Sequence, residues 1–332
     1  MSRYAELHCH SNFSFLDGAS HPHDLVQRAV ELGYEALAIT DHNGFYGAPR
    51  FRIAAAEAGL PTVYGVEIRF SPRRGESAEG GRGASDLASS KVAPPPALRV
   101  SSPSGGGNGA GGWRLGAGGS SHLVLLAPDP RGYAALARLV TRAQFRGEKD
   151  RPEYDHGELV EASGDGKLIA LTGCHAGEVP RHAAAGDLSG AMAAAARLRE
   201  VFPGRLFIEL WDHRMPGDDA RNAVLAEVAA RLRLPTVATN NVHYHDRSEA
   251  DIAEVLAAIA GRRDLDEGYG HWPATDERYL KSPAEMAARM SRYPGAVDRA
   301  ADLGRSLAFD LKLVAPRLPD FTLPGAFRTE ME

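Results

Sequence analysis

The feature of the sequence that most constrains its fold is a repeated alternation of short apolar segments with amphipathic ones. Strands that alternate with helices are typical of a parallel α/β sheet. The sequence therefore predicts an α/β barrel of seven strands, and 332 residues with 43% hydrophobic content are enough to build its core. The predicted strands cover residues 4–10, 36–40, 62–68, 122–127, 168–172, 206–210 and 236–240.

Helices are predicted from apolar residues at a spacing of three and four positions. In the first of them, Ser20 is expected to cap the helix and Gly33 to end it. The other predicted helices cover residues 51–58 and 219–232, the surroundings of Tyr133, Leu136 and Val140, and an alanine-rich segment through Met192 and Leu198.

Three segments depart from the alternation. Gly, Ser and Pro supply more than half of residues 71–121, which predicts a disordered insertion. Its arginines suit either a solvated linker or contact with an anionic partner. After a barrel of residues 1–246, residues 247–315 show only helical periodicity, over 252–259, 283–290 and 296–307, and predict a C-terminal helical appendage. Residues 316–332 are expected to form a linker.

Charge and composition narrow the class of protein. The net charge of −5 lacks the basic excess of a protein that grips nucleic acid mainly through its phosphates. No signal peptide or segment of membrane-spanning length is present, so a cytoplasmic protein without a membrane partner is expected. The two cysteines, Cys9 and Cys174, favour thiols or metal ligands over a disulfide framework.

Polar side chains gather where the predicted strands end. His8 and His10 project to the same face of the first strand, because residues two apart in a strand share a face. Active sites of parallel α/β folds form at the carboxyl ends of the strands, so the polar residues that follow are expected to converge there. They are Asp17, Asp41, His42, Glu67, Cys174, His175, Asn241 and His243.

This set of residues is suited to divalent metal ions. A lone His-x-His pair arises easily by chance, but several strand ends that all carry ligand-type residues favour a shared site. Imidazole, carboxylate and thiolate ligands suit Zn²⁺, with Mn²⁺ or Fe²⁺ where oxygen ligands dominate. Several metals in one pocket would activate water and stabilise charge on a phosphoryl group, so phosphate-ester chemistry is expected.

The motifs also resemble a known family. His8-Cys9-His10-Ser11, Thr40-Asp41-His42, Gly65-Val66-Glu67 and the strand opened by His122 resemble the polymerase and histidinol phosphatase (PHP) domain, a distorted (β/α)7 barrel that holds up to three metals. More narrowly, residues 11–20, Leu171-Thr172-Gly173-Cys174 and the segment 280–286 resemble bacterial error-prone DNA polymerases, relatives of the polymerase III alpha subunit.

The resemblance implies a set of metal ligands and a role. The family's ligand positions fall on His8, His10, Asp17, His42, Glu67, His122, Cys174, Asn241 and His243, with Asp41 orienting a ligand from behind. Up to three ions of Zn, Mn or Fe are implied as cofactors. DNA is an implied partner of the full-length protein. Proteins of damage tolerance or replication are further implied partners.

Two of these positions depart from the expected pattern. Asn241 stands where the family tends to carry an acid, and a neutral amide is a poor bridging ligand. Asp212, His213 or His245 could compensate for it. His122 opens its strand instead of ending it, so it can reach the same rim only from a reversed strand or by an irregular approach. His175 suits either a loop position or a phosphate contact.

Three functions follow as hypotheses. The first is the N-terminal metal-binding domain of an error-prone DNA polymerase acting in DNA damage tolerance and repair synthesis, with a phosphodiesterase or 3′–5′ exonuclease site. The second is a non-catalytic structural module with a degraded metal site, and the third is a free-standing phosphatase of the histidinol phosphate type. A polymerase palm is expected beyond Pro324 and is not in this chain, so a fragment, a truncated reading frame and a natural module all stay open.

Overall fold

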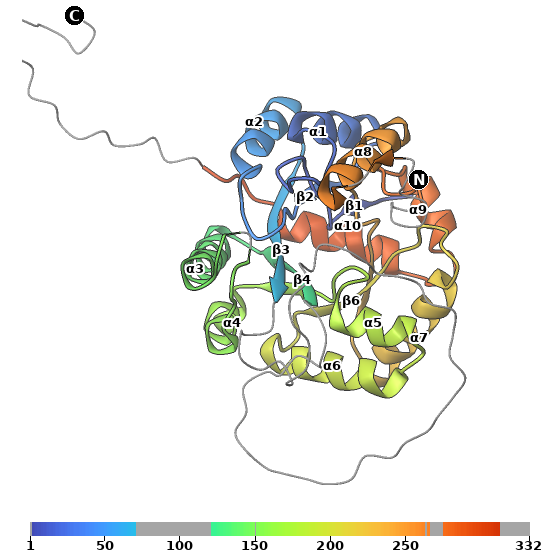
Figure 1. The fold of residues 1–332 in the computed structure, drawn as a ribbon. Helices are drawn as coiled ribbons and strands as arrows, with labels where there is room; N and C mark the ends of the chain where they lie inside the picture. The colour runs from blue at the N-terminus through green and yellow to red at the C-terminus, as the bar shows by residue number, and fades with distance from the viewer. Residues whose placement is uncertain (1, 71–120, 150, 263, 266–274, 313–332) are drawn as a thin grey trace, which may run out of the picture.

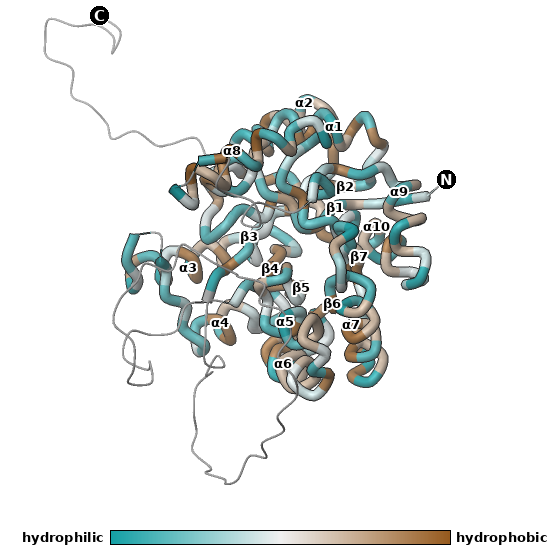
Figure 2. Tube along the Cα trace, turned by 45° about the vertical axis from the view of Figure 1, so that its right-hand side comes forward, coloured by the Kyte–Doolittle hydropathy of each residue, from teal (hydrophilic) through white to brown (hydrophobic). Residues whose placement is uncertain are grey.

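The seven predicted strands form one sheet in which each strand pairs with its neighbours in chain order. The computed structural model describes residues 2–70, 121–149, 151–262, 264–265 and 275–312. The strands lie at the centre of the molecule with helices around them (Figures 1 and 2). They are β1 (Ala5–Glu6), β2 (Ala36–Ile39), β3 (Thr62–Phe70), β4 (Ser121–Ala127), β5 (Ile169–Leu171), β6 (Leu206–Leu210) and β7 (Thr236–Ala238).

The sheet is mixed and not wholly parallel. The strands β1, β2 and β3 are parallel to one another, as are β5, β6 and β7, whereas β4 is antiparallel to both of its neighbours. The expectation of a parallel sheet is therefore wrong at β4. A parallel pair needs a crossover connection, usually a helix, and residues 71–120 show no helical periodicity in the sequence. This reversal lets His122, at the start of β4, reach the rim at which the parallel strands end.

A short parallel contact joins the two ends of the sheet. Cys9, after β1, forms a bridge with Val242, after β7. His10 N donates to Val242 O over 2.8 Å, and Val242 N donates to His8 O over 2.9 Å. The first and last strands therefore meet at their carboxyl ends, next to the candidate ligands, and this contact curls the sheet into a distorted barrel.

Helices that connect the strands cover the outside of the sheet. In α1, Leu25, Val26 and Ala29 are buried and fall on one face, as the helical spacing predicts. The covering helices are α1 (Pro22–Glu31), α2 (Ala48–Ala58), α3 (Pro130–Arg146), α4 (His156–Ser163), α5 (Glu178–Ala184), α6 (Leu188–Val201) and α7 (Asp218–Leu232), with a 3-10 turn η1 (Gly164–Gly166). Among the helices and strands that the structure describes, no helix has the length and apolar content to cross a bilayer.

Sequence reasoning missed some local features. Ser20 does not cap α1, whose N-cap is His21. The Ser20 hydroxyl instead donates to Glu249 and lies 3.1 Å from His245 Nδ1, because a distant segment supplies better partners than the helix end. The helices α4 and α5 were not predicted; they have only eight and seven residues, too few to display a clear period.

Of the helices after β7, α9 (Pro283–Arg289) and α10 (Ala296–Leu307) share the hydrophobic core of the barrel. The others that the structure describes are η2 (Arg247–Glu249) and α8 (Ala250–Gly261). Met286 of α9 and Ala300 of α10 belong to the same buried cluster as the strands. The domain boundary near residue 246 stays a prediction. Of the predicted insertion, Ser121 belongs to β4, and the rest, like residues 316–332, lies outside the described residues.

Gly304 lets α10 approach the amino ends of β1 and β2, the end opposite to the candidate ligands. A Cβ added at Gly304 would lie 2.5 Å from Ala5 Cβ, closer than side chains pack, and 3.2 Å from Ala36 Cβ, which is a tight contact. Any larger residue must therefore push the helix away from the sheet.

We expect Gly304→Val to lower the free energy of unfolding by about 2 kcal/mol through overpacking. Urea unfolding followed by circular dichroism measures this loss. Gly164→Val is the matched control, because an added Cβ there meets no atom within 4 Å. Equal stability of the two variants would contradict the close packing of α10.

Candidate metal centre

His8 and His10 lie at the carboxyl end of β1, where the barrel closes. Both side chains are almost fully buried and point to the same face, so that their Nε2 atoms lie 3.1 Å apart. The backbone bonds to Val242 hold this segment extended. The sequence expectation that the two imidazoles project together is met by this geometry.

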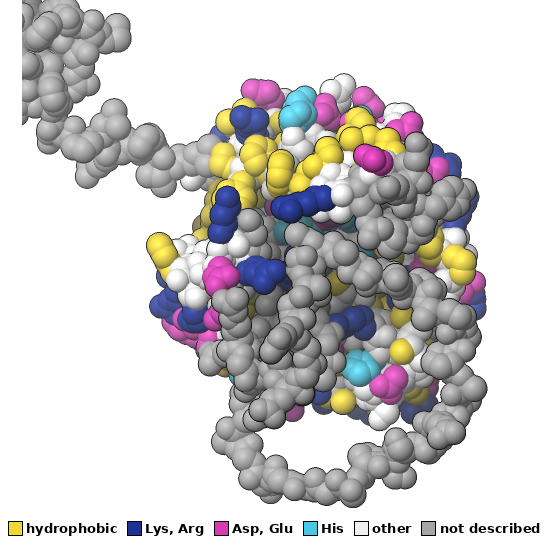
Figure 3. All heavy atoms as spheres, in the orientation of Figure 1, with side chains coloured by type: hydrophobic (Ala, Val, Ile, Leu, Met, Phe, Trp, Pro, Cys, Tyr) yellow, Lys and Arg dark blue, Asp and Glu magenta, His cyan; other side chains and the backbone are white. Residues whose placement is uncertain are grey.

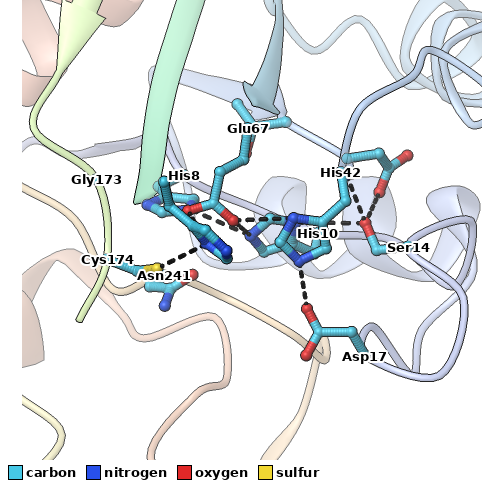
Figure 4. A network of polar contacts seen from close by, with 12 residues as sticks. His8, His10, Ser14, Asp17, His42, Glu67, Gly173, Cys174 and Asn241 are labelled. Carbon is cyan, nitrogen blue, oxygen red and sulfur yellow. Dashed lines mark hydrogen bonds and ion pairs between the residues drawn. The ribbon is translucent and has the colours of Figure 1, made fainter. Parts of the chain in front are cut away.

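The carboxylate of Glu67 lies at the centre of the site, on β3 (Figure 4). Its Oε1 lies 3.2 Å from His122 Nδ1 and 3.5 Å from His8 Nε2. Its Oε2 lies 3.0 Å from His42 Nδ1 and 3.6 Å from His10 Nε2. Four imidazoles from β4 and from the segments after β1 and β2 thus surround one carboxylate that is 1% exposed.

Asp17 extends the cluster on its solvent side. Its Oδ2 lies 2.7 Å from His42 Nε2 and 3.3 Å from His243 Nε2. Asp17 comes from the loop between β1 and α1, and its side chain is 36% exposed, whereas His243 is buried. This side is therefore the one from which a substrate could approach.

Cys174 and Asn241 stand on the other side of the pocket (Figure 4). Cys174 Sγ lies 3.3 Å from His122 Nδ1, and burial followed by the charge of Glu67 raises the pKa of its thiol. Asn241 is buried with a left-handed backbone (φ 43°), a conformation that asparagine tolerates. Its Oδ1 has no hydrogen-bond partner in the part of the chain that the structure describes.

Three overlapping groups in the pocket have the spacing of metal ligands. Within each group the ligand atoms all lie within 4.8 Å of one another. The groups are His8 with His10 and Glu67, His10 with Asp17 and His42, and His42 with Glu67 and His122. The structure thus brings together the predicted ligands on β3 and β4 and in the segments after β1 and β2, and places Cys174, Asn241 and His243 beside them.

The polar atoms of the pocket fit a bound cation. Glu67 Oε1 and His42 Nδ1 are buried and have no hydrogen-bond partner among the described residues, although they approach other ligand atoms. Buried polar atoms are costly without partners, so atoms that converge without hydrogen-bond geometry suit a shared ion. Burial lowers the pKa of His8, but Glu209 and Glu67 outweigh it and raise that pKa to about 10, so these two carboxylates attract positive charge at His8. At His10, burial and the neighbouring imidazoles of His42 and His243 lower the pKa well below its usual range.

Two buried carboxylates behind the histidines were missed by sequence reasoning. Glu209 of β6 lies with Oε1 2.6 Å from His8 Nδ1, and it accepts hydrogen bonds from Thr239 and from the backbone of Gly173. Because Nδ1 is engaged, Nε2 of His8 faces the pocket. Glu6 accepts from the backbone nitrogens of His8 and Asn240, and burial raises its pKa to about 7. A glutamate inside an apolar strand was the available signal in each case.

Asp41 lies behind the pocket and fixes the loop that carries Ser11 and Ser14. It accepts from Ser11 N over 2.8 Å and from the Ser14 hydroxyl over 2.8 Å. Ser14 Oγ in turn accepts from the backbone nitrogen of His42 and lies 3.3 Å from His10 Nδ1. Asp41 can therefore orient His42 and His10 through Ser14, which is the role expected of it.

The side chains proposed as substitutes for Asn241 have other partners. His213 Nε2 lies 2.7 Å from the carbonyl oxygen of Asn240, and His245 Nδ1 lies 2.8 Å from Glu249. Asp212 accepts from the backbone of Arg214. None of the three belongs to the ligand-spaced groups found among the described residues.

Comparison with known families decides the relationship. Residues 6–213 match the PHP domain. The chain belongs to the PHP domain family. The match spans more than half of the chain and contains Glu67 and Glu209, but it ends before Asn241 and His243. The family predicted from the strand-end motifs is therefore confirmed.

Relatives of this PHP domain chain are much longer proteins. It is 41% identical to an error-prone DNA polymerase of Nocardia farcinica and to one of Mycobacterium tuberculosis, with 97% of the chain aligned in both cases. The alignments cover 28% and 26% of those proteins. The chain thus spans about a quarter of the length of these curated relatives, and is homologous to one region of them.

Solved structures with a similar arrangement include two described as phosphoesterases. A putative metal-dependent phosphoesterase of Bifidobacterium adolescentis aligns with a TM-score of 0.41 and 17% identity, over 73% of this chain and 88% of that one. A two-domain protein of Bacteroides vulgatus containing a predicted PHP-like metal-dependent phosphoesterase aligns with a TM-score of 0.37 and 13% identity, over 86% and 62%.

We expect Glu209→Gln to weaken metal binding by about 10-fold to 100-fold, because the neutral amide no longer orients His8 or raises its basicity. Isothermal titration with Mn²⁺ measures the affinity. Glu227→Gln is the matched control, since Glu227 pairs with Arg231 on the exposed face of α7. Unchanged affinity in Glu209→Gln would show that this carboxylate does not support the site.

Proposed function

We propose that this PHP domain binds divalent metal ions at the Glu67 cluster and hydrolyses phosphodiester bonds as part of an error-prone DNA polymerase. The observation that carries the proposal is the convergence of four imidazoles on the buried Glu67 carboxylate. Two of the converging atoms, Glu67 Oε1 and His42 Nδ1, have no hydrogen-bond partner among the described residues. Zn, Mn or Fe suits this mixture of nitrogen and oxygen ligands. The relatives are named error-prone DNA polymerases, which supports the association with a polymerase.

Each group of the pocket has a part in the proposed chemistry. When bound, divalent metal ions supply Lewis acidity for the attack of water on a phosphate ester. His8, His10, His42, His122 and Glu67 would hold them. Glu209 keeps Nε2 of His8 directed at the pocket. Asp17, the most exposed of the carboxylates at the site, belongs to the ligand-spaced group with His10 and His42 and would hold an ion on the solvent side.

The full-length protein and its partners form the second part of the proposal. The relatives are named error-prone DNA polymerases, so we infer that the complete protein synthesises DNA during damage tolerance or repair. DNA is then the natural substrate of the pocket, at a 3′ end. Other damage-tolerance or replication proteins would be its partners.

A structural module without catalysis is the alternative that a specific observation favours. Asn241 offers a neutral amide where an acid would neutralise a cation, and the pocket loses one negative charge at that position. A free-standing phosphatase is a third reading, and it would act on small phosphate monoesters and not on DNA.

We expect the double substitution His8→Ala and His10→Ala to lower the metal content, because two of the three ligand groups contain one or both of these residues. It should also reduce nucleotide release from the 3′ end of DNA by at least about 100-fold. Metal content by plasma mass spectrometry and release from a labelled strand are the measurements. His182→Ala is the control, because His182 pairs with Asp187 on the surface. Metal-free wild-type protein that remains folded would favour the structural module.

Asn241→Asp tests the alternative directly. We expect it to raise the metal content of the purified protein by about one equivalent, because it adds a charged ligand atom beside the cluster. The same variant should raise the rate of nucleotide release. An unchanged metal content would show that Asn241 does not limit occupancy.

A further inference from the structure

The segment 275–281 lies beside the loop that carries His243. The backbone nitrogen of His243 donates to the carbonyl oxygen of Arg278 over 2.8 Å, and Tyr244 forms a parallel bridge with Tyr279. Arg278 is therefore the direct backbone neighbour of a candidate ligand at the mouth of the barrel.

The side chains of this segment divide between two faces, as in an extended chain. Glu277, Tyr279 and Lys281 share one face, because Lys281 Nζ lies 3.2 Å from Glu277 Oε2 and 4.0 Å from the centre of the Tyr279 ring. Leu280, on the opposite face, is part of the barrel core. Arg278 shares the face of Leu280, so its side chain is directed toward the barrel.

A buried charge cluster holds the segment in place. Glu277 is 2% exposed and forms ion pairs with Lys281 and with Arg289 of α9, the latter at 2.9 Å. Asn240 Nδ2 donates to the carbonyl oxygens of Glu277 and Tyr279, both over 2.8 Å. The position of Arg278 is thus fixed on both sides of the residue.

The guanidinium of Arg278 has no carboxylate or hydrogen-bond partner among the residues that the structure describes. Its Nε is buried and has no hydrogen bond, and the group forms no ion pair with any carboxylate in the described part of the chain. The neighbouring cations differ, since Arg247 lies 2.7 Å from Asp276 and Arg289 pairs with Glu277. A buried, unpaired donor of an arginine is costly, and its fork of N–H groups matches the oxygens of a phosphate.

The positive charge of Arg278 acts on a neighbouring histidine. Burial, followed by the positive charge of Arg278, lowers the pKa of His213 well below its usual range. Figure 3 shows several Lys and Arg side chains, separate from one another, on the face that it draws. A positive charge at the rim favours an anion beside it.

We propose that Arg278 binds the phosphate group of the substrate at the rim of the metal pocket. The ligand class is a phosphate ester, in the proposed setting a phosphodiester of a DNA strand, and inorganic phosphate is its simplest probe. The inference rests on the proposed function, because it assigns to Arg278 the recognition of the group that the metal site would attack. Arg278 is not placed among the metal ligands.

The test compares phosphate binding by the wild-type chain, Arg278→Ala and Arg278→Lys, each loaded with Mn²⁺, by isothermal titration with inorganic phosphate. Loss of the guanidinium should weaken phosphate binding by about 10-fold to 100-fold. Metal content and melting temperature should stay unchanged, which a merely structural role would not allow. Arg278→Lys keeps the positive charge but lacks the paired N–H donors of the guanidinium. Its phosphate affinity should lie between those of the wild-type chain and Arg278→Ala. Arg231→Ala, on the exposed face of α7, is the matched control.

The outcomes separate this inference from the proposed function. Weaker phosphate binding in both Arg278 variants, with full metal content, supports the assignment. A wild-type chain that binds metal and whose phosphate affinity stays within two-fold in both variants overturns it and leaves the metal site standing. A wild-type chain that takes up neither divalent metal nor phosphate overturns both.

Discussion

The structure of the site depends on the burial of one carboxylate among four imidazoles. Removing the charge of Glu67 from water costs several kcal/mol unless partners surround it. Its oxygens lie 3.0 Å and 3.2 Å from His42 and His122, and His8 and His10 complete the circle. These partners come from different strand ends, so the cluster can form only when the barrel is assembled. Folding and ligand geometry are coupled at this point.

Backbone contacts where the barrel closes also couple folding to the geometry of the ligands. The Cys9–Val242 bridge places the two histidines after β1 beside the loop after β7. Glu6 accepts from the backbone of His8 and of Asn240, so a single buried carboxylate supports both of these segments. Glu209 adds a contact to the imidazole of His8 itself. The outer carboxylates thus decide where the inner ligands point, as is usual behind metal-binding histidines.

Much of this could be predicted from the sequence, because strand periodicity and strand-end chemistry are local. All seven strands were located. For His122 the sequence left open a reversed strand or an irregular approach, and the structure has the reversed strand. What failed depends on distant partners. Ser20 has the chemistry of a helix cap but bonds to Glu249, more than two hundred residues away. Glu209 looks like an ordinary strand residue until the fold places it 2.6 Å from His8.

Anomalous X-ray diffraction from crystals of the chain soaked in Mn²⁺ tests most directly whether Glu67 and its imidazoles hold metal ions. We predict anomalous peaks between Glu67 and the imidazoles of His8, His10, His42 and His122, at coordination distances of about 2.0–2.3 Å. A well-ordered barrel with no anomalous peak at these residues would contradict it.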